Sequence, residues 1–376
     1  MPQISDYLYR KASANKIPLG ASFELSPVCN FACKMCYLRK TAAQVKAEGK
    51  RIRDWTEWLA LAEACRKEGT LYLLLTGGEP FLYPHFKELY LRLHEMGFVL
   101  SINTNGTLID EKTMEWLKGA APSRINVTLY GASPETYQRL CGHPDGYERA
   151  TNAIRMLKEA GIPVVINASM IPENACDLEK ILAFGKELGI NTRMATYMFP
   201  PIRRNREESD SRFSPETAAQ MYLRKMRYLL SEEDYQAELR KRLETAKEDT
   251  PKEAEDWGHS QEEFMRCRAG RSSFWVSWDG TMTACGLTPF PIQVCPFERP
   301  FRDCWLELTE RVRSTPVLRE CTGCPRRSVC NPCVAMLYAE TGQVNCRAPY
   351  LCEMAESILA NMKREVEERS QNGRKA

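Results

Sequence analysis

The sequence predicts an α/β fold, an open, partial (β/α)6 TIM-like barrel followed by a helical linker and a small cysteine-rich domain. Strand-like and helix-like runs alternate six times between about residues 20 and 200, a charged stretch covers 231–257, and ten of the sixteen cysteines lie between Cys267 and Cys352. Alternating strands and helices form parallel sheets with right-handed crossovers. Six units are fewer than the eight of a closed barrel, so we expect an open one.

The elements of this predicted barrel follow one another without long gaps. Six runs have the length and residue content of strands, namely Ala21–Leu25, Leu71–Thr76, Val99–Asn103, Arg124–Tyr130, Val164–Met170 and Thr192–Phe199. Five amphipathic stretches between them have the period of a helix, namely Trp55–Lys67, Phe86–Met96, Glu111–Leu117, Tyr147–Ala160 and Leu178–Leu188. Helix stop signals such as Met96-Gly97 separate several of these helices from the next strand.

Length and charge bound the possible functions. The chain has 376 residues and a net charge of +3, enough for one large and one smaller domain but without the clustered basic charge of a nucleic-acid-binding protein. It shows neither a signal peptide at its N-terminus nor an apolar run of membrane-spanning length. We therefore expect a soluble, cytoplasmic protein with neither nucleic acid nor membrane as a partner. In such a compartment sixteen cysteines favour metal binding over disulfides.

Three cysteines, Cys29, Cys33 and Cys36, follow the first predicted strand with the spacing C-x3-C-x2-C. An iron–sulfur cubane takes one cysteine per iron, so three close thiolates leave one iron free for a small molecule. A zinc site and buried free thiols are the competing interpretations. Zinc sites pair C-x2-C units with each other or with histidines, and the four histidines, at 85, 94, 143 and 259, have no ligand spacing.

Further motifs follow the next strands. Gly77–Pro80 comes after the second strand, Thr104–Gly106 after the third and Gly131–Ser133 after the fourth. Because the carboxyl ends of parallel strands share one edge of the sheet, these loops are expected to converge on one site. Glycines at 77 and 78 allow the backbone to approach a ligand closely, although a glycine-rich turn alone would also explain them.

The cysteine triplet together with Gly77-Gly78-Glu79-Pro80 resembles the cluster loop and GGEP motif of the radical S-adenosylmethionine (SAM) enzymes. The resemblance implies a 4Fe–4S cluster on Cys29, Cys33 and Cys36, whose open iron is chelated by the amino and carboxylate groups of SAM. It also implies an enzyme, an oxidoreductase that reductively cleaves SAM to a 5′-deoxyadenosyl radical and abstracts hydrogen from its substrate. A flavodoxin- or ferredoxin-type reductant would supply the electron.

The same resemblance suggests residues for SAM. Gly77, Gly78, Glu79 and Pro80 would bind its methionine part; Met35 and Tyr37 would lie near the adenine, and Asn105 and Thr128 near the ribose. Asn167 and Ser169 could reach the same ligand, although alternating strand residues are as often part of a core. The basic segment 200–206 is interpreted as a solvated loop in preference to a carboxylate clamp. No catalytic acid or base is assigned.

The cysteine-rich region has its own spacing. Cys267 is followed by twelve residues, Gly280, four residues and Cys285, and then by C-x2-C-x5-C-x2-C and two later cysteines. This resembles the seven-cysteine SPASM extension, although the third gap is x2 here and x3 in the family. The resemblance implies two auxiliary 4Fe–4S clusters, with a pair of zinc ribbons as the competing interpretation. The first cluster would be held by Cys267, Cys285 and Cys333, and the second by Cys321, Cys324, Cys330 and Cys352.

Two points about these auxiliary ligands remain open. The sequence around Cys352 favours it over Cys346 as the final ligand. The first auxiliary cluster either has an open iron or takes a fourth ligand from Cys295, Cys304 or Cys346. The expected domains are a radical SAM core at 17–215, a helical bridge at 216–260, a SPASM domain at 261–357 and a C-terminal helix or tail at 358–376.

The substrate is predicted only by class. SPASM enzymes mostly modify peptides or proteins, so we expect a peptide or protein to be crosslinked, oxidised or epimerised, with the auxiliary clusters as electron acceptors or substrate ligands. No acidic residue follows Cys285 closely, which counts against a sulfatase-maturase-like activity. A small-molecule oxidase and a non-catalytic electron-transfer protein are also compatible with the sequence. Only 28 residues precede Cys29, so any leader peptide is expected to need a separate leader-binding protein.

Overall fold

The computed structural model describes residues 4–203, 211–247, 267–315, 318–321 and 324–372. Its centre is an open, eight-stranded sheet with the order β6-β5-β4-β3-β2-β1-β7-β8. The strands are β1 Gly20–Glu24, β2 Tyr72–Thr76, β3 Val99–Thr104, β4 Arg124–Thr128, β5 Val164–Ser169, β6 Thr192–Ala195, β7 Ser273–Val276 and β8 Met282–Thr283. All neighbours except β7 and β8 pair in parallel. The predicted α/β fold with an open partial barrel is confirmed.

Two strands of this sheet were not predicted. The β7 strand pairs in parallel with β1, with Gly20 opposite Ser273, and β8 pairs with it antiparallel. The cysteine-rich region therefore begins as an extension of the barrel sheet instead of a separate layer. The last predicted strand is also shorter than expected, since β6 ends at Ala195 and the chain leaves the sheet before Phe199.

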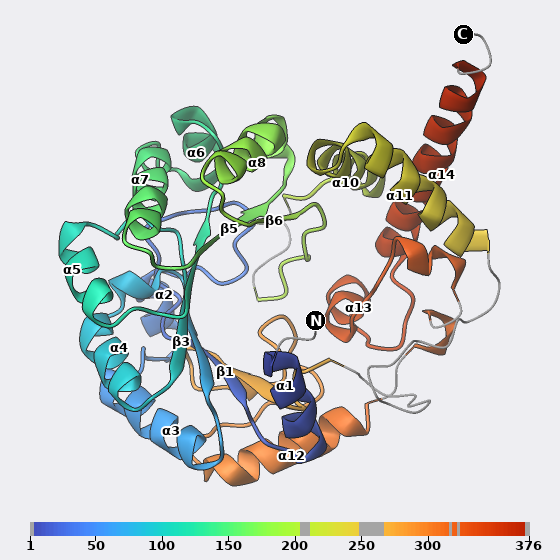
Figure 1. The fold of residues 1–376 in the computed structure, drawn as a ribbon. Coiled ribbons are helices and arrows are strands. Elements are labelled where there is room, and N and C mark those ends of the chain that lie inside the picture. The colour runs from blue at the N-terminus through green and yellow to red at the C-terminus, as the bar shows by residue number, and fades with distance from the viewer. Residues whose placement is uncertain (1–3, 204–210, 248–266, 316–317, 322–323, 373–376) are drawn as a thin grey trace.

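An outer ring of helices covers the convex side of the sheet (Figure 1). It consists of α3 Trp55–Lys67, α4 Phe86–Glu95, α5 Glu111–Gly119, α6 Pro134–Cys141, α7 Gly146–Glu159 and α8 Leu178–Glu187. Asp54 and Glu57 form a capping box at the start of α3, which satisfies backbone donors that the first helical turn leaves unpaired. The largest buried side chain of the core, Trp58 of α3, packs on Phe23 of β1 at a ring-centroid distance of 5.0 Å.

Shorter elements lie in the loops at the carboxyl edge of the sheet and in the cysteine-rich region. They are the helix α2 Ala42–Ala47 and the 3-10 turns η1 Pro80–Leu82, η2 Pro172–Asp177, η3 Arg319–Cys321 and η4 Pro325–Ser328. Three of these turns begin with a proline, whose fixed φ suits the first helical position.

Helix α1, Ile4–Ala14, precedes the first strand of the sheet, and helix α12, Phe301–Arg313, follows the last strand. A residue of α12 connects these two parts of the chain. Trp305 of α12 is 1% exposed, and its indole N–H donates to the carbonyl oxygen of Lys16 at 2.6 Å. Its ring lies 5.8 Å from that of Phe274 on β7. This contact binds segments that are 289 residues apart in sequence.

The remaining helices, α10 Pro215–Leu229, α11 Glu232–Lys247, α13 Val334–Thr341 and α14 Pro349–Asn372, lie beside the open edge of the barrel (Figure 1). The predicted helical linker is present in the charged stretch as α11, and many of its residues are exposed, but Tyr235 and Leu239, one helical turn apart, are fully buried. Tyr235 also donates to Glu365 of α14 at 2.9 Å. Residues 248–257 of that stretch lie outside the described residues.

The described part of the chain has no helix that is both long and apolar enough to cross a membrane.

The Trp305 contact is expected to contribute strongly to stability. Trp305→Ala should lower the free energy of unfolding by about 3–5 kcal/mol through the cavity that it creates. Trp305→Phe should cost roughly 1–3 kcal/mol, because the Lys16 carbonyl loses its donor. Urea unfolding followed by circular dichroism measures both. Leu306→Ala on the same helix is the control, since Leu306 is 40% exposed and should change stability by less than about 0.5 kcal/mol.

Candidate active site

The cysteine loop, residues 29–36, follows β1 and is held by the end of α6. The amides of Ala32 and Lys34 donate to the carbonyl oxygens of Cys141 and Leu140 at 2.9 and 3.1 Å. Carbonyls in the last turn of a helix lack partners within the helix. These two hydrogen bonds therefore give partners to carbonyls at the end of α6 and to amides of the cysteine loop. It fixes the loop at the carboxyl edge of the sheet.

The three cysteines of the loop differ in their surroundings. Cys33 is buried, whereas Cys29 and Cys36 are half-buried. Backbone amides already point at two of the sulfurs, with Phe31 N 3.3 Å from Cys29 Sγ and Arg39 N 3.3 Å from Cys36 Sγ. Amide hydrogen bonds to cysteine sulfur are a common feature of iron–sulfur sites.

Two thiols of the loop, those of Cys29 and Cys33, have raised pKa values. Burial raises the pKa of Cys29 to about 12, and the nearby Glu79 carboxylate adds to this effect. A hydrogen bond with Cys141, together with burial, raises the pKa of Cys33 well above its ordinary value. Metal ligands must be deprotonated, so binding of a cluster would release the protons of these thiols.

The two glycines of the Gly77–Pro80 loop allow it to lie directly against the entrance of the cysteine loop. A Cβ on Gly78 would lie 2.3 Å from the carbonyl oxygen of Val28, and one on Gly77 would lie 2.6 Å from that of Ser26. Gly78 N donates to Ser26 O at 2.7 Å, and Glu79 N donates to Val28 O at 2.9 Å. Gly77 also has a φ of 153°, a conformation that favours glycine.

Glu79 is completely buried and accepts three hydrogen bonds. The donors are the amide of Asn105 at 2.8 Å, the hydroxyl of Thr104 at 2.8 Å and the amide of Phe81 at 3.1 Å. Burial outweighs these donors and raises the pKa of Glu79 to about 7. Within the described contacts, this carboxylate connects the ends of β2 and β3.

Asn105 lies against the cysteine loop. Its Nδ2 donates to Asn30 Oδ1 at 2.8 Å and lies 3.8 Å from Cys29 Sγ, while its Oδ1 accepts from the Thr107 hydroxyl at 2.6 Å. Asn30 Nδ2 in turn donates to Thr107 Oγ1 at 2.9 Å. The predicted role of Asn105 near a ribose stays a prediction, and its contact with the cysteine loop is a further one that the sequence did not indicate.

The other predicted SAM residues lie on the same edge of the sheet. Met35 and Tyr37 are half-buried. Met35 packs on the barrel core, whereas Tyr37 packs on a small cluster that includes Trp278 and has the Arg203 guanidinium 5.5 Å from its ring. Thr128 at the end of β4 stands opposite Asn167 of β5 in the strand register. Ser169 ends β5 and is half-buried.

Arg203 forms an ion pair with a buried carboxylate. Its Nη1 lies 2.9 and 3.0 Å from the two carboxylate oxygens of Glu24, and its Nη2 donates to Gly286 O at 2.5 Å. The interpretation of this segment as a solvated loop is therefore wrong at Arg203, although the carboxylate that it clamps belongs to the protein. Burial raises the pKa of Glu24 even with this partner. Residues 204–206 lie outside the described residues.

A cavity of about 360 Å³ opens next to this ion pair, between the end of the cysteine loop and the β7–β8 turn. The charged residues on its wall are Lys40, Lys50, Arg203 and Asp279. Each cation is paired with a carboxylate: Lys40 with Glu48, Lys50 with Asp279 and Arg203 with Glu24. Both lysine ammonium groups also lie over the ring of Trp278, at 5.8 and 5.4 Å.

The structure brings Cys267, Cys285 and Cys333 near one another. Burial raises the pKa of Cys285, and Cys267 and Cys333 contribute as charged neighbours. Cys333 stands at the start of α13, where the backbone amides of Ala335 and Met336 point at its sulfur. These three thiols come from three separate segments of the cysteine-rich region.

The three cysteines considered as a fourth ligand contact other groups. Cys295 and Cys304 are electrostatic neighbours of each other, and the Cys295 sulfur lies 4.0 Å from Nη2 of Arg53. Cys346 Sγ lies 2.8 Å from Gln343 Oε1. A fourth protein ligand for the first auxiliary site stays a prediction.

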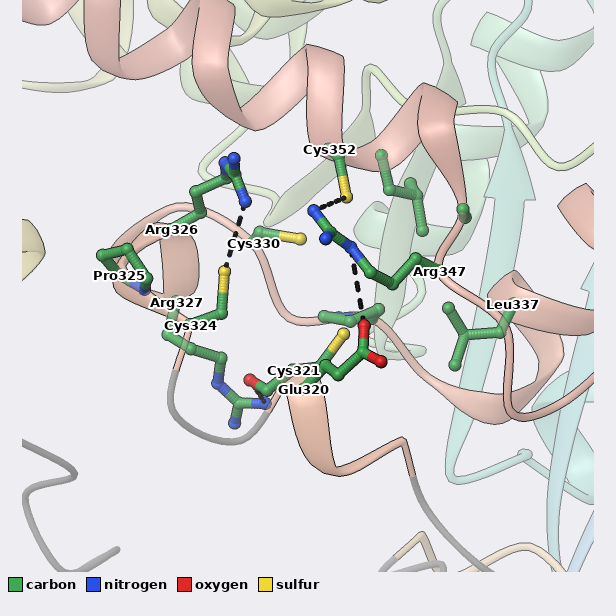
Figure 2. Close-up of a pocket in the computed structure, with 13 residues that line it drawn as sticks. Glu320, Cys321, Cys324, Pro325, Arg326, Arg327, Cys330, Leu337, Arg347 and Cys352 are labelled. Atoms are coloured by element: carbon green, nitrogen blue, oxygen red, sulfur yellow. Dashed lines mark hydrogen bonds and ion pairs between the residues drawn. The ribbon is translucent and has the colours of Figure 1, made fainter.

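The second set of four cysteines surrounds a cavity. Cys321, Cys324, Cys330 and Cys352 line a space of about 250 Å³, with their sulfurs directed inward (Figure 2). Among the described residues no group of three or more Cys, His, Asp or Glu side chains is arranged to hold a single metal ion. A cubane instead spreads four cysteines over four irons, which is compatible with four sulfurs around a cavity.

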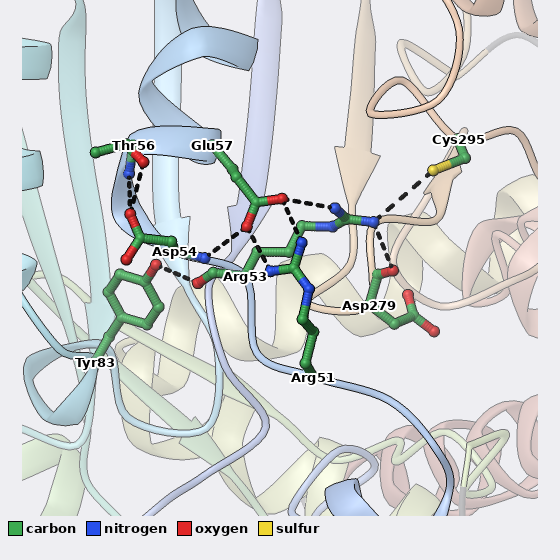
Figure 3. A network of polar contacts seen from close by, with 8 residues as sticks. All are labelled: Arg51, Arg53, Asp54, Thr56, Glu57, Tyr83, Asp279 and Cys295. Atoms are coloured by element: carbon green, nitrogen blue, oxygen red, sulfur yellow. Dashed lines mark hydrogen bonds and ion pairs between the residues drawn. The ribbon is translucent and has the colours of Figure 1, made fainter.

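A polar network joins the β7–β8 region of the chain to the start of α3 in the barrel (Figure 3). Arg53, just before α3, pairs with Glu57 at 3.1 Å, donates to Asp279 O at 3.4 Å and lies 3.8 Å from the Phe297 ring centroid. A Cβ on Gly280 would lie 2.3 Å from Arg53 Nη2. Gly280, the glycine of the C-x12-G-x4-C spacing, also has a φ of 93°, a backbone conformation that favours glycine, and its lack of a side chain lets Arg53 approach closely.

Several residues of the site escaped prediction. Asn30, Thr107 and Glu24 are ordinary in sequence, and only the fold brings Thr107 to Asn30 of the cysteine loop and Arg203 to Glu24. Arg326 and Arg347 lie close in sequence to Cys324 and Cys352, a signal that could have indicated contact with sulfur.

The pKa of Glu79 predicts a pH-dependent contribution to stability. Because folding raises this pKa from 4.5 to about 7, the protonated carboxyl is favoured by folding. Its stabilising contribution is complete below pH 4.5 and is lost as the pH rises through 7. The unfolding free energy of the iron-free wild type minus that of Glu79→Gln should therefore fall by roughly 3 kcal/mol over this range. A difference that is constant with pH in urea unfolding would contradict the assignment.

Comparison with known proteins agrees with this geometry. The sequence model of the Radical SAM superfamily matches residues 23–185. The AdoMet-dependent heme synthase of Methanosarcina barkeri is 26% identical over 89% of this chain and 96% of its own length. The PqqA peptide cyclase of Ruegeria pomeroyi is 30% identical, and the match spans 46% of this chain and 45% of the cyclase.

A solved structure has the same fold. SuiB of Streptococcus suis, in complex with the precursor peptide SuiA, superposes with a TM-score of 0.65 at 18% identity, covering 91% of this chain and 78% of SuiB. The matched segment 23–185 includes the cysteine loop, the Gly77–Pro80 loop and Asn105. The chain therefore carries a radical SAM domain, a domain that implies a 4Fe–4S cluster and SAM, and its homologues include radical SAM enzymes.

Proposed function

We propose that this protein is a radical SAM enzyme that modifies a peptide or protein and carries two auxiliary 4Fe–4S clusters. The observation that carries the proposal is the convergence of the cysteine loop, the Gly77–Pro80 loop and Asn105 at one edge of the sheet. When bound, the cluster and SAM supply the radical that abstracts hydrogen. Cys29, Cys33 and Cys36 would hold the first cluster.

The protein's own part in this reaction is to bind and orient. The Gly77–Pro80 backbone, fixed against Ser26 and Val28, would present its peptide groups to the methionine part of SAM. Asn105 donates to the cysteine loop and so holds Cys29 in place. Met35 and Tyr37 would bind the adenine, and Thr128, Asn167 and Ser169 are proposed for the remainder of the cofactor.

A peptide or protein substrate is supported by the PqqA peptide cyclase, a relative of the barrel, and by SuiB, whose fold binds a precursor peptide. The auxiliary cysteines, Cys267, Cys285 and Cys333 at one site and four around the cavity at the other, would hold clusters that accept the electron lost by the substrate radical. A flavodoxin- or ferredoxin-type reductant and a leader-binding protein are the proposed partners.

A second candidate is oxidation of a carboxylate-bearing tetrapyrrole. The match to the heme synthase covers nearly the whole of both chains, whereas the match to the peptide cyclase covers about half of each. These observations support a small-molecule oxidase as the main competitor.

The cluster content is tested by anaerobic reconstitution. The wild type should bind about twelve irons per chain, three cubanes, and form 5′-deoxyadenosine from SAM and dithionite. Cys33→Ala should bind about eight irons by the same count and form no 5′-deoxyadenosine, because one ligand of the SAM-binding cluster is missing. Cys176→Ala, a change at an exposed cysteine, is the matched control and should behave as wild type.

The results of this experiment distinguish the enzyme from a carrier of electrons. Twelve irons without SAM cleavage would indicate an electron-transfer protein, and zinc in place of iron would contradict both functions.

The substrate class is tested by deuterium transfer. Peptides deuterated at carbon, and iron porphyrins deuterated on their carboxylate side chains, are each incubated with SAM and reductant. Mass spectrometry of 5′-deoxyadenosine then identifies the hydrogen donor. Deuterium from a peptide alone would support the first candidate, and deuterium from the porphyrin alone would replace it with the second.

A further inference from the structure

The second cysteine cavity contains arginines as well as thiols. Arg326, Arg327 and Arg347 line it together with the four cysteines, and Glu320 is the carboxylate on its wall (Figure 2). The mechanism proposed above assigns no function to these guanidinium groups. Their positions relative to the sulfurs indicate a separate role.

Two of the arginines contact sulfur directly. Arg326 Nη1 lies 3.6 Å from Cys324 Sγ, and Arg347 Nη2 lies 3.8 Å from Cys352 Sγ. Both distances are within hydrogen-bonding range for sulfur, and both donors carry a full positive charge. Arg327 instead reaches the carbonyl oxygen of Cys321, at 3.5 Å.

Each of these two guanidiniums is also held by a carboxylate on its other side. Arg326 Nη2 pairs with Glu356 Oε1, and Arg347 Nε lies 3.9 Å from Glu320 Oε2. The two carboxylates are 55% and 65% exposed, against 26% for Arg326 and 52% for Arg347, so water screens each carboxylate more than the arginine that it pairs with. The charge next to the sulfurs is therefore positive.

The first auxiliary site is different in this respect. The donor to Cys267 Sγ is the backbone amide of Ala269 at 3.5 Å, and amides of Ala335 and Met336 point at Cys333. Arg203 is near Cys285 but binds the Gly286 carbonyl and the Glu24 carboxylate. Neutral amide donors at one site thus contrast with charged donors at the other.

We propose that Arg326 and Arg347 raise the reduction potential of the cluster held by Cys321, Cys324, Cys330 and Cys352, and so make it the auxiliary site that accepts an electron more readily. This inference rests on the proposed function, in which these four cysteines bind a 4Fe–4S cluster. One-electron reduction adds one negative charge and no proton to the cluster and its thiolates. Charged hydrogen bonds to the sulfurs stabilise that reduced form.

The test is a dithionite titration of the reconstituted full chain, followed by electron paramagnetic resonance at fixed potentials. The signal of this cluster is the one that Cys321→Ala removes. Arg326→Gln and Arg347→Gln should each lower the ratio of reduced to oxidised cluster several-fold. The double variant should lower it at least tenfold, which equals about 59 mV for a one-electron couple.

Variants of the opposing carboxylates provide a result of opposite sign. Glu356→Gln and Glu320→Gln remove negative charge from the far side of the same guanidiniums and should raise the ratio of reduced to oxidised cluster. Both side chains are mostly exposed, so these variants are expected to fold. Arg224→Gln, at an exposed pair with Glu179 in another part of the chain, is the control and should leave the potential unchanged.

The outcomes separate this inference from the proposed function. If Cys321→Ala removes no iron and no signal, the cluster assignment fails. If the cluster is present and the glutamine variants of both arginines keep the wild-type potential, the inference is overturned. If these variants bind no cluster, an unchanged potential in both Glu356→Gln and Glu320→Gln overturns it instead.

Discussion

The structure of the site depends on a backbone contact between two loops. The Gly77–Glu79 backbone donates to the carbonyls of Ser26 and Val28, the residues that lead into the cysteine loop. Any side chain at Gly78 would enter the position of the Val28 carbonyl. Glu79 in turn accepts hydrogen bonds from residues at the end of β3, so the Asn105 loop is also fixed relative to the Gly77–Pro80 loop. Two loops that would bind one cofactor are thereby fixed by peptide groups, which are stiffer than long side chains.

The barrel and the cysteine-rich region are joined by charge as well as by the shared sheet. Arg203 connects buried Glu24 of β1 to Gly286, and Arg53 connects the start of α3 to Asp279. An ion pair that is mostly buried is costly to break once formed, because one charge would remain without a partner. These contacts fix the position of the β7–β8 region relative to the cysteine loop.

The barrel could be predicted because most of its strands and helices are specified by the pattern of residues within each element. The six strands from Gly20 to Ala195 and five of the helices between them have their own hydrophobic period, and motifs at strand ends converge by geometry alone, whereas the short helices α2 and α6 were not predicted. The pairing of β7 with β1 could not be predicted, because four residues between cysteines have no clear period and their partner lies some 250 residues away. The burial of Arg203 and of one face of α11 had the same cause, since each depends on a distant segment.

The sheet order also has a consequence for the order in which the protein is assembled. The first three cysteines lie within eight residues, whereas Cys267, Cys285 and Cys333 come together only when the chain has returned to the edge of β1. Contacts between distant segments form later in folding than local ones. On a growing chain, the three thiols of the cysteine loop would therefore reach their folded positions before Cys267, Cys285 and Cys333 come together.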